Sequence, residues 1–198
     1  MLEIDLSFPH SYSVEEFRDL PGSGKPRIPV HYIPQPKTRP EHDGLWLKIA
    51  SAEGNEWIGV FAEGYDSPPA ITRVVTTPNP DSVCVISSGE AYAVNPRTPG
   101  SHERIGVMPV LDVRPILEQR LLIFSDFTSL AAYGPNGLVW YSPRVCWDNL
   151  KIHTITEATI EGTGFDPPSG QDRPFAVDIR TGQSVLPPPT SNDGKSIW

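Results

Sequence analysis

Runs of apolar residues separated by turn residues dominate the chain between residues 120 and 142. Apolar residues fill 121–124, and a second, largely apolar run covers 127–133. Gly-Pro-Asn-Gly at 134–137 then precedes a third run at 138–141. Short runs rich in aromatic residues and bounded by Gly, Pro, Asn and Asp are typical of strands, and Asn-Gly favours a hairpin because both residues can adopt positive φ. The pattern predicts a three-stranded antiparallel meander.

The same pattern recurs on both sides of this meander. Further strands are predicted at 45–50, 57–62, 71–76, 82–87, 90–94, 160–162 and 175–179. The chain of 198 residues contains 23 prolines and 16 glycines, which argues against long helices because an interior proline costs about 3 kcal/mol. We therefore predict an all-β fold whose antiparallel meanders form a sandwich or open, twisted sheets.

Three of the predicted strand pairs end in similar sequences. These are Ala-Val-Asn at 93–95, Ala-Tyr-Gly at 132–134 and Ala-Val-Asp at 176–178, and their last residues are 39 and 44 positions apart. Spacings of about 40–50 residues with several strands each are typical of propeller blades. Residues 82–185 resemble quinoprotein-type β-propeller repeats, in which each blade carries an Ala-hydrophobic-Asp strand and a Gly-bearing turn.

The resemblance departs from that family where Asn95 and Gly134 replace the aspartate, and none of the family's cofactor ligands can be placed on this chain. It implies propeller-like blades as the alternative to a sandwich, and no cofactor is expected. Three or four such units fall at or below the ~4–8 blades of a closed propeller. The blades would therefore stay open or be completed by a second chain.

The first 44 residues differ from the rest. Residues 12–17, Tyr-Ser-Val-Glu-Glu-Phe, contain a Ser-x-x-Glu capping box flanked by aromatic residues that can form a hydrophobic staple, so one short N-terminal helix is predicted. Six prolines follow between 21 and 40, and each removes a ladder donor. We expect a helix and Pro-rich arm over 1–44, packed on a single β domain of 45–198 with a polar C-terminal tail. A helical turn at 114–118 would make the fold α+β.

The net charge of −8 is spread along the chain without long acidic runs. Such a field repels phosphate backbones, and no basic helix is present to bind a membrane surface, so neither nucleic acid nor membrane is expected as a partner. No stretch approaches 18 apolar residues, and the N-terminus lacks a basic signal-peptide region. The expectation is a soluble, cytoplasmic protein. Cys84 and Cys146 are expected to be buried thiols, with a disulfide as the alternative.

Two groups of side chains could hold a metal or act as paired acids. His31, His42 and Asp43 could converge on a metal ion, although none of the five histidines has a recognised ligand spacing, so solvated loop histidines are the favoured interpretation and no metal is predicted. Asp126 and Glu157 could form a carboxylate pair, but their spacing does not indicate one.

A second group could carry nucleophilic catalysis. Cys146, Asp148 and His153 are close in the sequence and could supply a nucleophile, an orienting acid and a base. A thiolate needs an exposed position and a lowered pKa, whereas Cys146 lies in a predicted strand, which favours a structural thiol. A hydrolase or sugar-active enzyme with an acidic cleft lined by Asp126, Asp148 and His153 is the alternative function.

The segment 140–149 contains the residue types that dominate protein interfaces. Tyr141, Arg144, Trp147 and Asp148 are candidate binding residues, whereas alternation could place Trp147 in the core. Arg144 is the one basic residue between 121 and 150, so it is suited to meet an acidic group. The predicted function is a non-enzymatic protein-interaction or regulatory protein of the immunity type, with another protein or a second copy as partner. Small-ligand binding remains the further alternative.

Overall fold

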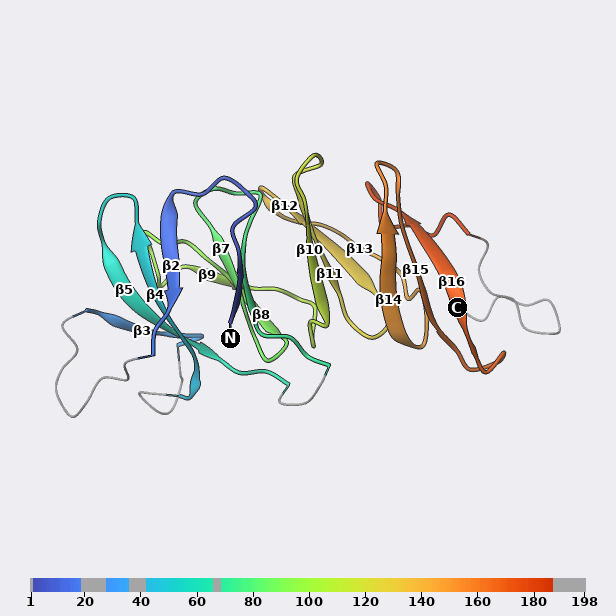
Figure 1. Ribbon diagram of the computed structural model, residues 1–198, viewed down its shortest axis with the longest axis horizontal. Coiled ribbons are helices and arrows are strands. Elements are labelled where there is room, and N and C mark those ends of the chain that lie inside the picture. The colour runs from blue at the N-terminus through green and yellow to red at the C-terminus, as the bar shows by residue number, and fades with distance from the viewer. Residues whose placement is uncertain (1, 19–27, 36–41, 66–68, 187–198) are drawn as a thin grey trace. The chain divides into compact units, whose positions relative to one another are not determined.

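The computed structural model describes residues 2–18, 28–35, 42–65 and 69–186 (Figure 1). Within these residues the protein is all-β, with 16 strands and no helix. The chain divides into two compact units, residues 1–110 and 111–198. The predicted fold class is therefore confirmed. No helix in the described part of the chain is long and apolar enough to cross a membrane.

The first unit contains two sheets. The four-stranded sheet has the order β2-β4-β5-β3, with β2 (Tyr12–Glu16), β4 (Gly44–Ser51), β5 (Glu56–Ala62) and β3 (Val30–Ile33). The five-stranded sheet has the order β1-β6-β7-β8-β9, with β1 (Glu3–Asp5), β6 (Arg73–Thr76), β7 (Val83–Ser87), β8 (Glu90–Val94) and β9 (His102–Arg104). Two outer strands are parallel to their neighbours, β1 to β6 and β3 to β5. All other neighbouring strands in these sheets are antiparallel.

Alternating apolar side chains explain why these two sheets pack face to face. Leu47 and Ile49 of β4 are fully buried, and so are Val83 and Val85 of β7. Because residues two apart in a strand point to the same side, each strand presents a continuous apolar face. Both faces contribute to one core cluster.

The predicted N-terminal helix is wrong, because residues 12–16 form strand β2. This strand pairs antiparallel with β4, with Tyr12 opposite Ser51 and Glu16 opposite Leu47. Tyr12 is buried and donates its hydroxyl to the carbonyl of Ser82 at 3.0 Å, while Ser13 next to it is exposed. A helix of one or two turns is marginal in water, whereas the edge of β4 offers this segment a complete ladder and a buried site for the tyrosine ring.

The second unit also contains two sheets. The first has the order β10-β11-β12-β13, with β10 (Asp112–Ile116), β11 (Leu121–Ser125), β12 (Leu130–Gly134) and β13 (Gly137–Tyr141). The second has the order β14-β15-β16, with β14 (Asp148–Ile155), β15 (Thr159–Asp166) and β16 (Gln171–Asp178). All pairs are antiparallel. The alternative of a helical turn at 114–118 is not seen, because Pro115 lies in the edge strand β10, where a missing N–H is tolerated.

The predicted meander is present, but its tight turn differs from the expected one. Gly134 pairs with Gly137, so Pro135 and Asn136 are the central residues. Proline holds φ near −65°, which excludes a turn with positive φ at both central positions. Positive φ occurs instead at Gly137, at 98°, and the register then shifts between Ala132 and Tyr133.

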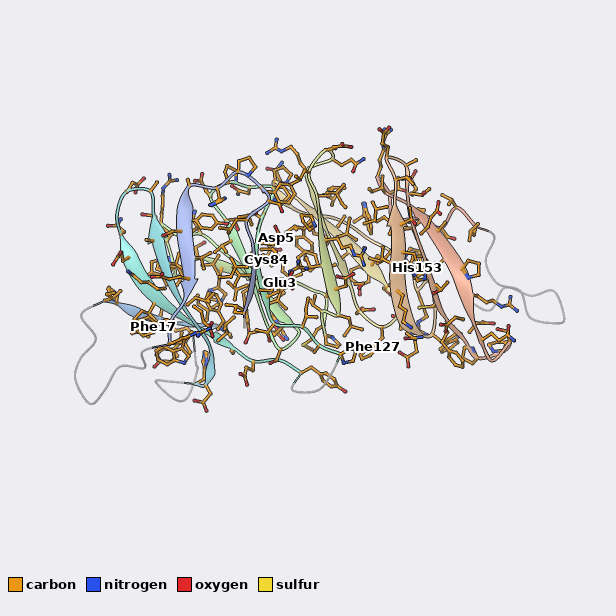
Figure 2. The ribbon with its side chains drawn as sticks, viewed as in Figure 1. Glu3, Asp5, Phe17, Cys84, Phe127 and His153 are labelled. Carbon is orange, nitrogen blue, oxygen red and sulfur yellow. The ribbon has the colours of Figure 1, made fainter. Side chains whose placement is uncertain are left out.

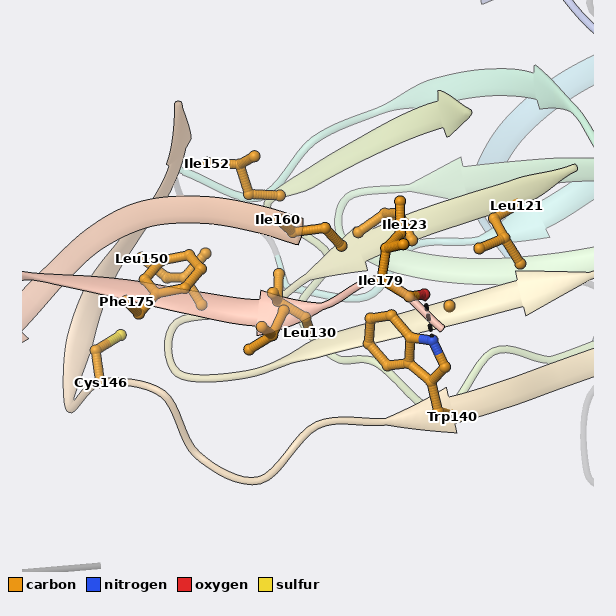
Figure 3. Close-up of a cluster of buried hydrophobic side chains, with 12 residues drawn as sticks. Leu121, Ile123, Leu130, Trp140, Cys146, Leu150, Ile152, Ile160, Phe175 and Ile179 are labelled. Carbon is orange, nitrogen blue, oxygen red and sulfur yellow. Dashed lines mark hydrogen bonds between the residues drawn. The ribbon is translucent and has the colours of Figure 1, made fainter. Parts of the chain in front are cut away.

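One core cluster joins the two sheets of the second unit (Figure 3). Trp140 is 7% exposed, and its indole N–H donates to the carbonyl of Ile179 at 2.9 Å (Figure 3). Cys146 lies in the same cluster. Both cysteines, Cys84 and Cys146, are free and buried, so the alternative of a disulfide between these two residues is not seen.

The three similar strand pairs of the sequence lie in three different sheets, as β7–β8, β11–β12 and β15–β16. A propeller requires successive sheets to be placed around one axis, and that arrangement stays a prediction. The division at residue 44 also stays a prediction, although β2 and β3 from the first 44 residues pair with β4 and β5.

Candidate functional site

The loop 142–147 connects the two sheets of the second unit and is fixed by backbone hydrogen bonds. Ser142 donates its N–H to the carbonyl of Leu130 at 2.8 Å, and its hydroxyl accepts from the N–H of Leu130 at 2.9 Å. Further along, the N–H of Val145 donates to the carbonyl of Thr128 at 2.8 Å. Side chains on this loop are therefore carried on a rigid support, which is where binding residues are commonly found.

Cys146 anchors the loop from inside. Its side chain is 3% exposed, its Sγ donates to the carbonyl of Phe127 at 3.4 Å, and it packs so closely against Gly164 that a Cβ there would collide with it. Burial raises the pKa of the thiol to about 12. At neutral pH this cysteine is a protonated structural thiol, because the reactive thiolate needs a lowered pKa.

Arg144 and Trp147 form an exposed stacked pair. The guanidinium carbon of Arg144 lies 4.8 Å from the centroid of the Trp147 ring, within the range of a cation–π contact worth about 0.5–1 kcal/mol at an exposed site. Trp147 is 43% exposed, so it does not lie in the core, which was the alternative to a binding role. Arg144 forms no ion pair with any residue that the structure describes. Its N–H groups are thus available to an acceptor outside the chain.

Tyr141 lies at the end of β13, 44% exposed, and its hydroxyl is held in place. It donates to Oδ2 of Asp126 at 2.9 Å, and Oδ1 of Asp126 accepts the N–H groups of Thr128 and Ser129, both at 2.7 Å. Burial, and then the hydrogen bond to Asp126, raise the pKa of Tyr141 to about 12. The tyrosine is a neutral donor at pH 7, and Asp126 is engaged in shaping its own turn.

Asp148 begins strand β14 and is exposed. Its Oδ1 accepts the N–H of Asn149 at 2.7 Å, and Asn149 has a positive φ of 56°. The Asn149 amide donates to Oδ2 of Asp172 at 3.2 Å. Asp148 therefore stabilises the backbone at the start of β14. Its exposed carboxylate directly follows Trp147 in the chain.

The three candidates for nucleophilic catalysis do not assemble. His153 lies on β14 (Figure 2), is exposed, and its Nε2 is 2.9 Å from Oγ1 of Thr163. Cys146 points into the core and shares no hydrogen bond with His153 in the described structure. Burial therefore separates the thiol from the solvent-facing imidazole.

Asp126 and Glu157 are also kept apart. Asp126 follows the end of β11, whereas the carbonyl of Glu157 accepts a hydrogen bond from Gln119, which precedes the start of β11. A five-residue strand spans roughly 17 Å, so the two carboxylates lie towards opposite ends of it and do not form a pair.

The group His31, His42 and Asp43 does not form a metal site. The ring nitrogens of His42 lie 2.9 Å from the carbonyl of Asp43 and 3.2 Å from that of Pro34. His31 packs edge-on against Trp57, with ring centroids 5.6 Å apart. No group of three or more His, Cys, Asp or Glu side chains within the described ranges is arranged to hold a metal ion.

The sequence pattern did not predict two exposed apolar residues next to Tyr141. Leu138 and Val139 are each 53% exposed, although strict alternation would bury one of them. The register shift opposite Ala132 and Tyr133 leaves Val139 without a directly opposite residue and turns two successive side chains outward. Val139 and Tyr141 then extend the exposed apolar surface along the edge strand β13.

Comparison of the sequence with protein-family models finds no matching family. Comparison with curated proteins finds no matching relative.

Proposed function

We propose that this chain is a non-enzymatic protein-interaction or regulatory protein of the immunity type. Its partner-binding surface, called the 141–149 surface below, consists of Tyr141, Arg144, Trp147 and Asp148. The observation that carries the proposal is the exposed Arg144–Trp147 stack on a hydrogen-bonded loop. Tryptophan, tyrosine and arginine are the residues most enriched among those that dominate binding energy.

The chemistry of this surface suits a partner with an acidic group next to an apolar side chain. The Arg144 guanidinium can offer two parallel N–H donors to a carboxylate, a geometry that lysine cannot provide. Trp147 and Tyr141 offer large, rigid contact areas for an apolar side chain at low cost in conformational entropy. Because the stack and the Tyr141–Asp126 hydrogen bond exist before binding, less ordering is needed when a partner arrives.

These few residues would form the centre of an interface and not the whole of it. A stable interface buries about 800 Å² on each partner, so neighbouring surface must contribute a rim. Val139 and Leu138 on the adjacent edge strand, each 53% exposed, are suited to that role.

The proposal extends to the setting and architecture of the protein. Two free, buried thiols suit the cytoplasm, where cysteines are kept reduced. Propeller-like blades stay the alternative to a sandwich or open sheets, and the placement of the three similar strand pairs in three separate sheets suits that alternative.

Affinity capture from the native source tests the proposed function. Three baits are compared: the wild-type full chain, the double variant Arg144→Ala/Trp147→Ala and a control variant. The control, Arg180→Ala, removes an exposed arginine elsewhere in the second unit. A protein retained by wild type and control but reduced at least about tenfold on the double variant supports the proposal, since 1.4 kcal/mol corresponds to a factor of ten. Equal retention on all three baits contradicts it.

A further inference from the structure

A cavity of about 170 Å³ lies in the first unit, remote in sequence from the 141–149 surface. It is lined by residues 30–32, Gln35, Pro99, Gly100 and His102. Strand β3 and the residues after it supply one wall, and the loop that leads into β9 supplies the other. Both strands are at the edges of their sheets, so the cavity opens where the two packed sheets of this unit end.

Strand alternation places one histidine from each sheet at this opening. His31 is two residues from Ile33, which is 1% exposed in the shared core, so both point to the same side of β3. His102 pairs with Val94, another fully buried core residue, and opposite residues of an antiparallel pair share a face. The two imidazoles therefore lie on the inner sides of facing sheets.

The wall formed by residues 95–101 is held in place by its own hydrogen bonds. The indole N–H of Trp57, from the opposite sheet, donates to the carbonyl of Pro96 at 2.8 Å. Within the loop, Thr98 N–H donates to the carbonyl of Asn95 at 3.1 Å, and Ser101 N–H to that of Thr98 at 2.8 Å. A cavity with such support is largely preformed, as small-molecule sites usually are.

Among the described residues that line the cavity there is no Asp, Glu, Lys or Arg. Burial lowers the pKa of His31, which favours the neutral ring, and a neutral imidazole both donates and accepts a hydrogen bond. Nδ1 of His102 is buried without a hydrogen-bond partner in the described part of the chain, and a buried N–H without an acceptor is costly. Nε2 is therefore the ring nitrogen of His102 that is placed to donate. The Gln35 amide adds both a donor and an acceptor.

We propose that this cavity binds a small, uncharged molecule that carries hydroxyl groups, namely a polyol or a single sugar residue. Each hydroxyl can donate and accept at once, which matches the paired capacities of His31 and Gln35. A charged ligand would find no opposite charge among the described lining residues, which is unfavourable. The volume is below the ~300–1,000 Å³ of sites for drug-sized ligands, and it corresponds to the liquid volume of about six water molecules at ~30 Å³ each.

Nuclear magnetic resonance of the histidine rings in the full chain tests this inference. Glycerol, glucose and methyl glucoside are the probes, and sodium acetate is the charged control. The ring resonances of His31 and His102 are expected to shift with a saturating dependence on glycerol or glucose. The ring of His10, which bonds to its own neighbour's carbonyl at 3.0 Å, is expected not to move. If methyl glucoside shifts the rings as much as glucose does, the cavity also accepts a sugar linked through its anomeric oxygen, as at the end of a glycan. If methyl glucoside causes no shift, the cavity binds only free polyols and free sugars.

Substitutions give a second readout. His31→Phe and His102→Phe keep a planar ring but remove the nitrogens, and each should weaken probe binding at least about fivefold, as expected for the loss of a hydrogen bond worth ~1 kcal/mol. His10→Phe is the matched control and should leave binding unchanged. No saturating shift with any hydroxyl probe, or equal affinity for acetate, would overturn the inference. Either result leaves the 141–149 surface unaffected, because that surface belongs to the other unit.

Discussion

Gly182 and Gly170 provide a direct test of how tightly Trp140 is packed. Both glycines end turns that begin with an aspartate, at Asp178 and Asp166, and each donates its N–H to the carbonyl of that aspartate, at 2.8 and 2.9 Å. Their φ values are nearly equal, +69° and +65°. They differ in surroundings, because a Cβ on Gly182 would lie 2.5 Å from Cε3 and 2.7 Å from Cδ2 of Trp140, whereas a Cβ on Gly170 meets nothing within 4 Å.

Alanine at the two positions should therefore have different effects on the free energy of unfolding. Left-handed backbone costs an L-residue about 1–2 kcal/mol, so Gly170→Ala should destabilise by about that amount. Gly182→Ala carries the same cost plus about 1–3 kcal/mol for overpacking against a buried ring, which gives about 2–5 kcal/mol in total. The difference between the variants isolates the contact with Trp140.

Urea unfolding followed by far-ultraviolet circular dichroism measures both effects, with midpoints compared at equal m-values. In a Trp140→Ala background the ring is absent, so Gly182→Ala should cost only about 1–2 kcal/mol more. Equal destabilisation by Gly170→Ala and Gly182→Ala in the wild-type background would show that the ring does not pack on this turn.

Three further predictions concern stability. Glu90→Gln should lower the free energy of unfolding by about 1–3 kcal/mol, because it weakens the charge-assisted hydrogen bonds that Arg104 donates to a buried carboxylate, and a melting temperature unchanged from wild type would contradict this. Burial raises the pKa of the Cys84 and Cys146 thiols to about 12 from near 9. As the pH rises, the thiols of the unfolded chain therefore lose their protons before those of the folded chain. The free energy of unfolding should be highest below about pH 9 and should fall as the pH approaches 12. A urea midpoint that stays constant between about pH 9 and pH 12 would refute this prediction. Arg144→Ala should change stability by less than about 1 kcal/mol, as expected at the surface, and unfolding would instead make this arginine structural.

The strands were predictable from the sequence where alternation and turn residues agreed. The strands predicted at 45–50 and 57–62 occur as β4 and β5, because Leu47 and Ile49 share one face of their strand and a Gly-Asn turn follows. The capping box within residues 12–17 is a local signal that favours a helix, and the structure overrides it. The free edge of β4, which converts the segment into β2, is a non-local partner that no short pattern reveals.

The candidate site shows the same division between local and non-local information. The residue types of Tyr141, Arg144 and Trp147 predict a binding segment from the sequence alone. Whether these side chains are exposed depends on how the surrounding sheets pack. The expected strand around Cys146 is wrong, because this residue lies in the loop 142–147, where it is nevertheless buried. The outward turn of both Leu138 and Val139 follows from a register shift in β13, which alternation along one strand cannot predict.

Hydrogen–deuterium exchange of the full chain with its captured partner tests the central claim most directly. The backbone N–H of Arg144 forms no hydrogen bond with a described residue, so it should exchange rapidly in the unbound protein. On partner addition, we predict slower exchange across residues 141–149, with the cavity loop 95–101 unchanged. Slower exchange elsewhere on the chain, with none in 141–149, would contradict the proposal that this surface binds the partner.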